Sequence, residues 1–406
     1  MTTKIPFPLI DYDKHPAFAE LVSESTREKS ITTAVEEVEN KTNTYFNSRG
    51  YSEQTQSKKA LEESMAVLKD HIRQDEQITP LLKEAIIEGV DSALKSLLAE
   101  SKYHRTRREY SSLSQSESKL LEKLRKDGAF SIFLKPEIIQ ELNTLLADDI
   151  NELKYNRENV LVRRLKKVKS PSAAFSRIQS LLTDLGLLNV ANAYHGHSME
   201  LTSASLEVSR PESTWWKSCY QDKQLPTSKS AYMHYDFEFN LQKFLIYLEE
   251  VDENNGPFSV VMGSNNIDLP KFVFTFVKEF ELVSRNKNVF EKSKVYYRNQ
   301  FFSEGNRKLF LQIPKALRGA SHFGDDLIDG SNIQKELLAN EKNYTTKDGN
   351  LIMFDGHHGM HRGGLCSEKE RLALFLTLTP RMSLFTKVKL SANHSLKTLL
   401  SKLSKD

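Results

Sequence analysis

Glycine is distributed unevenly along this chain, and its distribution constrains the fold more than any other feature. Of the 16 glycines in 406 residues, only Gly50 and Gly89 precede residue 128, whereas eleven lie at or after Gly256. Glycine marks turns and weakens helices. A glycine-poor stretch therefore favours long helices, and a glycine-rich stretch favours short strands joined by turns. The sequence predicts an α+β chain in which the helices come first.

Residues 52–125 have the pattern of amphipathic helices. One helical face carries apolar side chains at Leu61, Met65, Leu68 and Ile72. The last helical segment, SQSESKLLEKLRKDG, ends in Gly128, which is a suitable C-terminal cap. We expect residues 1–120 to form a helical N-terminal extension.

From about residue 129 the pattern changes to strands mixed with helices. Strands are predicted in AFSIFL, SMELTSASLEVSRP, LQKFLIYLEEV, LIMFDG and ERLALFLTLTP. Between them, one helix begins at Pro136 and another ends near Gly186. We expect a second domain over residues 121–382, with an insertion at about 265–345, and a basic helical tail over 383–406.

Composition and charge limit the class of protein. A net charge of +3 gives no support to nucleic-acid binding. Two cysteines, Cys219 and Cys366, cannot form a disulfide framework, which favours a reducing compartment. The first residues lack the apolar segment of a signal peptide, and no stretch approaches the roughly 18 apolar residues of a transmembrane helix. We expect a cytoplasmic protein without a transmembrane segment, and its oligomeric state stays open.

The segment AYMHYDFEFN places His234 and Asp236 two residues apart. On a strand or at its end, such positions point to the same side. An imidazole and a carboxylate are two of the three ligands in the 2-His-1-carboxylate triad of non-haem Fe(II) oxygenases. The pair alone is weak evidence, because two polar residues at the start of a strand would look the same.

A second segment, LIMFDGHHGMHRGG, carries three histidines in a glycine-rich turn. His361 is the expected third metal ligand, with His357 and His358 as alternatives. Arg371 follows ten residues after His361, at the start of the next predicted strand. An arginine there is able to bind the distal carboxylate of a dicarboxylate such as 2-oxoglutarate, whose 2-oxo acid end chelates the metal.

These two segments together resemble the phytanoyl-CoA dioxygenase family of Fe(II)/2-oxoglutarate oxygenases. The resemblance covers roughly residues 120–382. It rests on His-x-Asp, an apolar strand, an Asp-x-x-x-Gly-Pro turn, a Gly-Ser end, a distal His-x-Gly-Gly and an arginine. The matching residues are His234, Asp236, Asp252, Gly256, Pro257, Gly263, Ser264, His361, Gly363, Gly364 and Arg371.

The resemblance implies a double-stranded β-helix (jelly-roll or cupin-like) core with flanking helices. It implies Fe(II) held by His234, Asp236 and His361, 2-oxoglutarate anchored by Arg371, and O₂ as co-substrate. The activity implied is hydroxylation of a small molecule, biosynthetic or lipid-like, with release of succinate and CO₂. Related halogenases replace the metal carboxylate with a small residue, so the presence of Asp236 favours oxygenation.

Alternatives remain open at this point. The barrel could be a catalytically silent binding or scaffold protein, or a cupin-like iron enzyme that does not use 2-oxoglutarate. The basic run RRLKKVK, residues 163–169, is a candidate contact for a phosphate-bearing or carrier-bound substrate, although a solvated helix face is the simpler interpretation. Whether Lys243, Trp215 or Trp216 contacts a substrate is likewise open.

Overall fold

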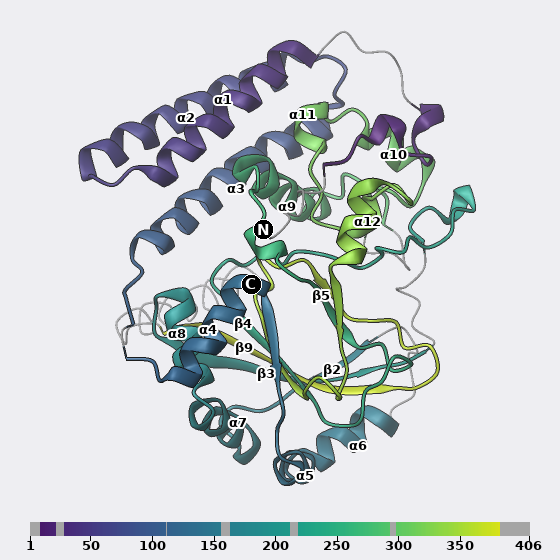
Figure 1. Cartoon of the computed structure of the whole chain (residues 1–406). Helices are drawn as coiled ribbons and strands as arrows, with labels where there is room; N and C mark the ends of the chain where they lie inside the picture. Colours follow the sequence, from purple (N-terminus) through teal and green to yellow (C-terminus); the bar gives the residue numbers. More distant parts are fainter. Residues whose placement is uncertain are drawn as a thin grey trace, which may run out of the picture.

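The computed structural model describes residues 9–21, 28–110, 112–155, 163–211, 218–292 and 298–381. Over these ranges the chain is a mixed α+β fold with two antiparallel sheets and flanking helices (Figure 1). Trp215, Trp216 and the tail over 383–406 lie outside the described residues. No helix within these ranges is long and apolar enough to cross a membrane.

The glycine-poor first part is helical, as the sequence predicts. Its helices are α1 (Glu28–Asn47), α2 (Tyr51–Gln74), α3 (Pro80–Arg105) and α4 (Gln115–Asp127). Helix α4 begins with a capping box, in which Ser114 and Glu117 exchange side-chain and backbone hydrogen bonds. It ends at Gly128, whose left-handed conformation (φ 78°) confirms the expected cap.

The larger sheet has six strands in the order β1-β7-β4-β9-β3-β2, all antiparallel to their neighbours. The strands are β1 (Ala129–Ile132), β2 (Arg163–Lys167), β3 (Met199–Ser209), β4 (Gln242–Tyr247), β7 (Leu351–Phe354) and β9 (Arg371–Pro380). The register places Arg371 opposite Ser209, and Lys243 between Phe354 and Thr377.

The smaller sheet has three strands in the order β6-β5-β8. They are β5 (Phe258–Val261), β6 (Glu341–Tyr344) and β8 (His361–Arg362). Apolar side chains from both sheets, including Tyr247, Phe258 and Phe354, form one buried cluster. The two sheets therefore face each other across a shared core.

Helices α5 to α8 pack against the six-stranded sheet through a second apolar cluster. They are α5 (Pro136–Leu145), α6 (Ala147–Tyr155), α7 (Ala173–Asp184) and α8 (Leu187–His195). The single helix expected from Pro136 is divided in two, because the chain leaves helical geometry at Leu146 (φ −108°, ψ 7°).

The basic run at 163–169 corrects one sequence prediction. Residues 163–167 form strand β2, which pairs with β3, so the expected solvated helix face is wrong. Backbone pairing at the edge of the sheet determines the conformation here, and local propensity does not.

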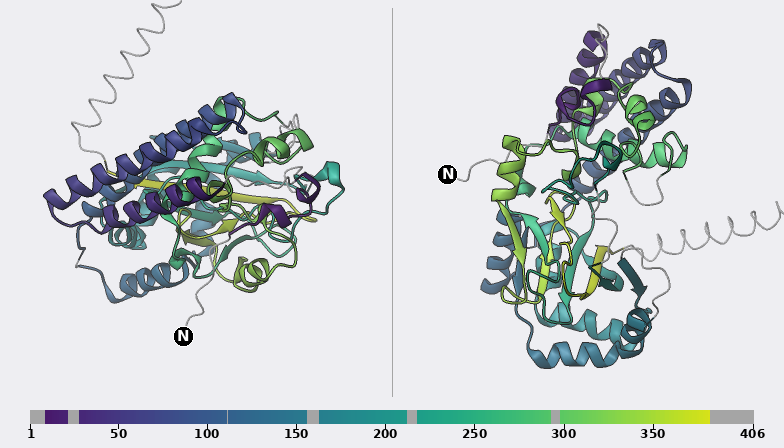
Figure 2. Two further views of the ribbon diagram at one scale, coloured as in Figure 1. Left: turned by 90° about the horizontal axis from the view of Figure 1, so that it is seen from above. Right: turned by 90° about the vertical axis from the view of Figure 1, so that its right-hand side faces the viewer.

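The described part of the range 265–345 holds four α-helices and strand β6. The helices are α9 (Lys271–Asn286), α10 (Glu304–Phe310), α11 (Lys315–Arg318) and α12 (Asn332–Ala339). Their apolar side chains belong to the same core as those of α1 to α3. Close packing is visible at Gly89, where an added Cβ would lie 3.1 Å from the ring of Phe276 on α9. Figure 1 and the right-hand view of Figure 2 show this helical layer on one side of the sheets.

Candidate functional site

His234 and Asp236 lie in a loop before β4 and are not part of a regular strand. Backbone hydrogen bonds hold the loop against the turn that follows β7. His234 and His361 exchange a pair of them, at 2.9 and 3.0 Å, and the amide of Asp236 donates to the carbonyl of Gly356 at 2.8 Å. The expected strand is thus only a bridge, but it brings together two segments that are more than a hundred residues apart.

The side chains of His234, Asp236 and His361 converge at this bridge. Their nearest nitrogen and oxygen atoms all lie within 4.8 Å of one another. The Nε2 atoms of His234 and His361 lie 3.8 and 3.6 Å from the Asp236 carboxylate. The Nδ1 atoms are each 2.9 Å from a backbone carbonyl, of Tyr232 and of Gly359. These carbonyls accept the Nδ1 protons, so both Nε2 lone pairs face the carboxylate.

The charges in this group suit a divalent cation. Burial by itself would raise the pKa of Asp236, but His361, Lys243 and His234 lower it to about 2. Burial lowers the pKa of His361 to about 3. Near neutral pH the group therefore combines an ionised carboxylate with a neutral imidazole, which are the forms that bind metals.

Gly356 provides the space that Asp236 occupies. A Cβ added at Gly356 would lie only 1.9 Å from Oδ2 of Asp236 and 3.4 Å from the ring of His361. No real Cβ approaches an oxygen so closely, so any larger residue at this position would displace the carboxylate.

Two lysines contact Asp236 from different elements. The ammonium of Lys243, on β4, is 2.6 Å from Oδ2 of Asp236, and its side chain is 24% exposed. Lys278, on α9, is buried and donates to the backbone carbonyl of Asp236. Burial lowers the pKa of Lys278 to about 8. Lys243 thus forms an ion pair with a protein carboxylate in this structure.

Arg371 is fully buried and already has a carboxylate partner. Its guanidinium is 3.1 Å from Glu207 and 3.1 Å from the hydroxyl of Ser209, and it also donates to the carbonyl of Gly256. The side chains of Arg371 and Glu207 are each only 1% exposed. The arginine predicted to anchor a co-substrate is therefore neutralised by the protein itself in this structure.

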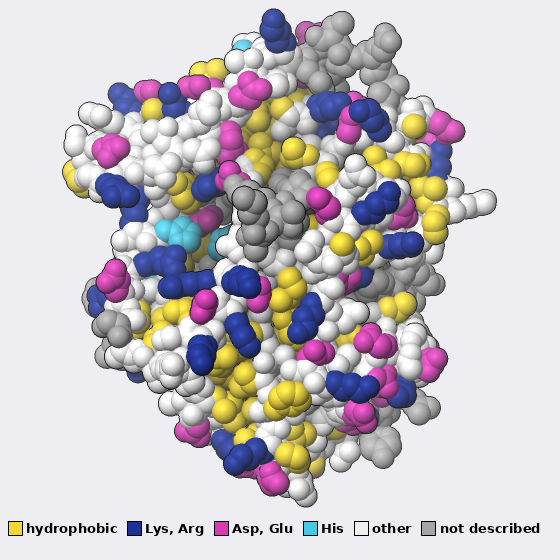
Figure 3. Space-filling view, in the orientation of Figure 1, with side chains coloured by type: hydrophobic (Ala, Val, Ile, Leu, Met, Phe, Trp, Pro, Cys, Tyr) yellow, Lys and Arg dark blue, Asp and Glu magenta, His cyan; other side chains and the backbone are white. Residues whose placement is uncertain are grey.

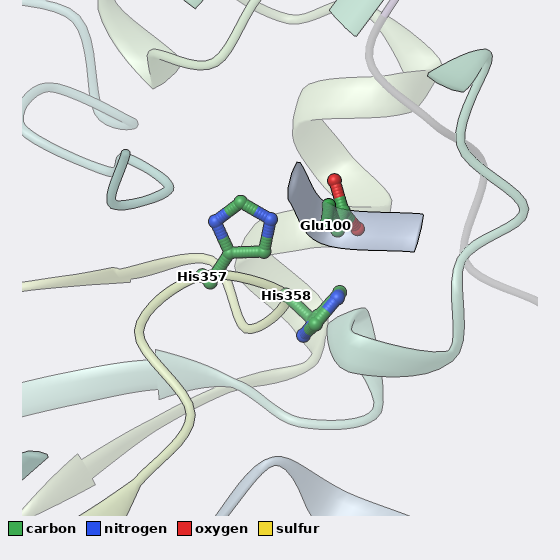
Figure 4. Close-up of side chains that lie close together, drawn as sticks. All are labelled: Glu100, His357 and His358. Carbon is green, nitrogen blue, oxygen red and sulfur yellow. The ribbon is translucent and has the colours of Figure 1, made fainter. Parts of the chain in front are cut away.

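His357 and His358 lie apart from the group around His361. Their ring nitrogens, with the carboxylate of Glu100 from α3, form a second group whose ligand atoms all lie within 4.8 Å of one another (Figure 4). Burial lowers the pKa of His357 well below its usual value. Burial also opposes the charged form of His358, but the adjacent Asp355 outweighs it and raises the pKa. The structure thus separates the three histidines that the sequence left as alternatives.

Sequence reasoning missed Glu207, Lys278 and Glu100. Glu207 lies inside a strand between Leu206 and Val208, and a buried acid in that position implies a charged partner. Lys278 and Glu100 give no such signal, because a single charged residue in an amphipathic helix is ordinary. Only packing of α3 and α9 against the turn brings them to the site.

One face of the molecule is hollowed. In Figure 3 histidine and acidic side chains show inside this hollow, and lysine and arginine side chains follow its lower edge. The edge is therefore positively charged, which favours an anionic ligand.

No protein-family model matches this sequence, and no curated protein matches it. Several solved structures, some with 2-oxoglutarate bound, are similar to this chain over about two thirds of its length. EctD from S. alaskensis, with 2-oxoglutarate and 5-hydroxyectoine, is 13% identical, with 68% of this chain and 80% of that chain covered and a TM-score of 0.38.

HygX from Streptomyces hygroscopicus, with nickel and 2-oxoglutarate bound, is 13% identical, with coverage of 67% and 88% and a TM-score of 0.36. The epimerase SnoN, in complex with Fe³⁺, alpha ketoglutarate and nogalamycin RO, is 13% identical, with coverage of 65% and 84% and a TM-score of 0.34. At these identities and TM-scores, the similarity assigns no family and no residue role to this chain.

Proposed function

We propose that this chain is an Fe(II)/2-oxoglutarate-dependent dioxygenase that hydroxylates a small molecule, biosynthetic or lipid-like, and releases succinate and CO₂. The observation that carries the proposal is the convergence of His234, Asp236 and His361. Two imidazoles whose Nε2 atoms face one ionised carboxylate would leave three positions of an octahedral ion open. When bound, the iron would activate O₂ for reaction with the substrate.

The strand order supports a double-stranded β-helix. From β4 onward the chain crosses between two facing sheets four times, from β4 to β5, from β6 to β7, from β7 to β8 and from β8 to β9, as in a jelly roll. The segment at His234 pairs with β8 of the smaller sheet, which also contains β5 and β6. Strands β4, β7 and β9 belong to the larger sheet. The metal group then lies at one end of the core between the sheets.

The donor set fits Fe(II). Both histidines have their rings oriented by backbone carbonyls, and Asp236 is held ionised by its surroundings. The ammonium of Lys243 neutralises the carboxylate. A bound metal ion would neutralise it as well, and Lys243 would then be available to bind an anionic ligand.

The fit of 2-oxoglutarate depends on Glu207. A distal carboxylate that binds Arg371 has to share the guanidinium with Glu207 or displace it, because two buried carboxylates repel each other strongly. We propose that Arg371 is the anchor and that the side chain of Glu207 moves away from it when the co-substrate binds.

The same pair favours a second candidate function. If Glu207 remains on Arg371, the chain is an iron enzyme that does not take 2-oxoglutarate at this position. A phosphate-bearing or carrier-bound substrate remains compatible with both candidates, because lysine and arginine side chains border the hollow.

The test is anaerobic addition of Fe(II) and then 2-oxoglutarate to the metal-free chain. We expect the weak visible charge-transfer band of the chelate to appear, and we expect Asp236→Ala and His361→Ala to lose it. His71→Ala, on helix α2, is the control that keeps it. Iron binding without a band would favour the second candidate, and no iron binding at all would reject both. Succinate release with candidate substrates then separates an enzyme from a silent binding protein.

A further inference from the structure

The second group of ligand atoms joins the N-terminal helices to the turn that carries His361. Glu100 is one turn from the end of α3, and His357 and His358 follow β7. The Glu100 side chain is 17% exposed, and His357 as a whole is 8% exposed. Figure 4 shows Glu100 and His357 facing each other, with His358 beside the gap between them. Residues distant in sequence thus present metal-binding atoms to one small space.

Asp355 orients His358 as a metal ligand would be oriented. Its carboxylate lies 2.9 Å from Nδ1 of His358 and accepts the backbone amides of His357 and His358 at 3.0 and 3.1 Å. It also accepts the hydroxyl of Tyr194. The Nδ1 proton of His358 therefore points at Asp355, and Nε2 is left for another partner. Carboxylate-to-histidine contacts of this kind are typical behind metal ligands.

His357 is held through its Nδ1 by two neighbours. This atom is 3.2 Å from the carbonyl of Asp236 and 3.2 Å from the ammonium of Lys278. The Nε2 atom of His357 has no hydrogen-bond partner among the described residues. This nitrogen is on the side of the ring that faces Glu100.

We propose that Glu100, His357 and His358 form a second site, for a divalent cation of the zinc class, that fastens helix α3 to the turn carrying His361. Two imidazoles and one carboxylate, completed by water, are a normal ligand set for Zn²⁺. A tetrahedral ion with ligands at about 2.0–2.1 Å places them about 3.3 Å apart, so the side chains close inward when it binds. The site does not depend on the function proposed above.

One of the surrounding charges is positive and disfavours the binding of a cation. Glu100 and Asp355 contribute negative charge, whereas the buried ammonium of Lys278 lies next to His357. The alternative is an ion-pair network without a metal, in which His358 lies beside Asp355, and Oε1 of Glu100 lies 3.4 Å from Nε2 of His104. The two states differ in whether Nε2 of His358 carries a proton or a metal ion, and metal binding distinguishes them.

The experiment is equilibrium dialysis of the untagged, metal-free full chain against Zn²⁺, followed by metal analysis. We expect two equivalents in the wild type, one in Glu100→Gln, one in His361→Asn, and none in the double variant. Glu84→Gln, an exposed glutamate on the same helix, is the matched control and keeps two. Separate losses in Glu100→Gln and His361→Asn distinguish failure of this site from failure of the first.

A second measurement uses His361→Asn alone, in which only the new site remains. Zn²⁺ should raise its melting temperature, and adding Glu100→Gln should abolish the rise. Adding Lys278→Met should instead tighten Zn²⁺ binding by about tenfold, because a neighbouring positive charge is removed. If Glu100→Gln binds as many equivalents as the wild type, or if Zn²⁺ does not stabilise His361→Asn, the second site does not exist.

Discussion

The two groups of histidines and carboxylates on either side of the turn 355–361 have the same composition but different surroundings. In the first, His234 and His361 are both oriented by backbone carbonyls of their own segments. In the second, the carboxylate of Asp355 orients His358, and the third ligand comes from the helical layer. The ligand residues of the first group therefore come only from the loop before β4 and from strand β8, whereas the second group exists only when α3 packs against the turn.

The turn after β7 directs the side chains of its three histidines into two different groups. His361 pairs with His234 through the backbone, which directs its side chain toward Asp236. His357 and His358 precede Gly359, where the chain bends back through a hydrogen bond to the carbonyl of Asp355. Positions three or four residues apart thus point to opposite sides of the turn, and composition alone does not distinguish them.

The largest difference is expected when one histidine is removed from each group. His361→Ala should abolish the Fe(II)/2-oxoglutarate band and substrate-dependent succinate release, because one of three iron ligands is lost. His358→Ala should keep the band. Visible absorbance under anaerobic conditions and succinate analysis measure the two effects. If His358→Ala also lost the band, the assignment of the distal ligand to His361 would be wrong.

Gly356→Ala should affect the first group far more than the second. The new Cβ would collide with Oδ2 of Asp236, so we expect Fe(II) affinity to fall about 100-fold, the upper end for residues that support metal ligands. Anaerobic titration with Fe(II) measures this. Gly50→Ala is the control, because no atom lies within 4 Å of its added Cβ. Equal affinities in both variants would contradict the geometry.

Glu207→Gln tests whether Arg371 is free to bind a co-substrate. Removal of the internal carboxylate leaves a buried guanidinium without its counter-charge, so the melting temperature should fall in the absence of 2-oxoglutarate. With 2-oxoglutarate, stability should recover and the affinity should rise about tenfold, because one competing charge is gone. Titration of the charge-transfer band gives the affinity. No change in affinity would favour the candidate that does not use 2-oxoglutarate.

The smallest expected effect is the difference in pKa between His358 and His361. In the metal-free chain, His358 should keep its proton above pH 6.5, whereas His361 should stay neutral to well below pH 5, because its pKa is lowered to about 3. His358 then adds stability below pH 6.5 that is lost as the pH rises through its folded pKa. His361 has the opposite effect. Because its pKa is lower in the folded state than in the unfolded state, the free energy of unfolding decreases as the pH falls from 6.5 toward 3. Histidine NMR across this range measures both, and titration of His361 near pH 6.5 would contradict the contrast.

Much of the fold was predictable from local pattern. The long helices before residue 128, the cap at Gly128 and the strands at β3, β4, β7 and β9 follow from periodicity and glycine placement. Strand β2 was not predictable, because its five basic and apolar residues carry no clear period and become a strand only by pairing with β3. The break at Leu146 was hidden for a similar reason, since the helical pattern continues across it.

The candidate site was predictable in its ligands but not in its surroundings. The amino-acid sequence by itself determined that His234, Asp236 and His361 were candidates for one group, because residue type and order carry that information. Only the tertiary structure decided that Arg371 is neutralised by Glu207, that Lys243 pairs with Asp236, and that His357 and His358 meet Glu100. Charge pairs between distant segments depend on which side chains are buried together, and burial is a property of the packed chain.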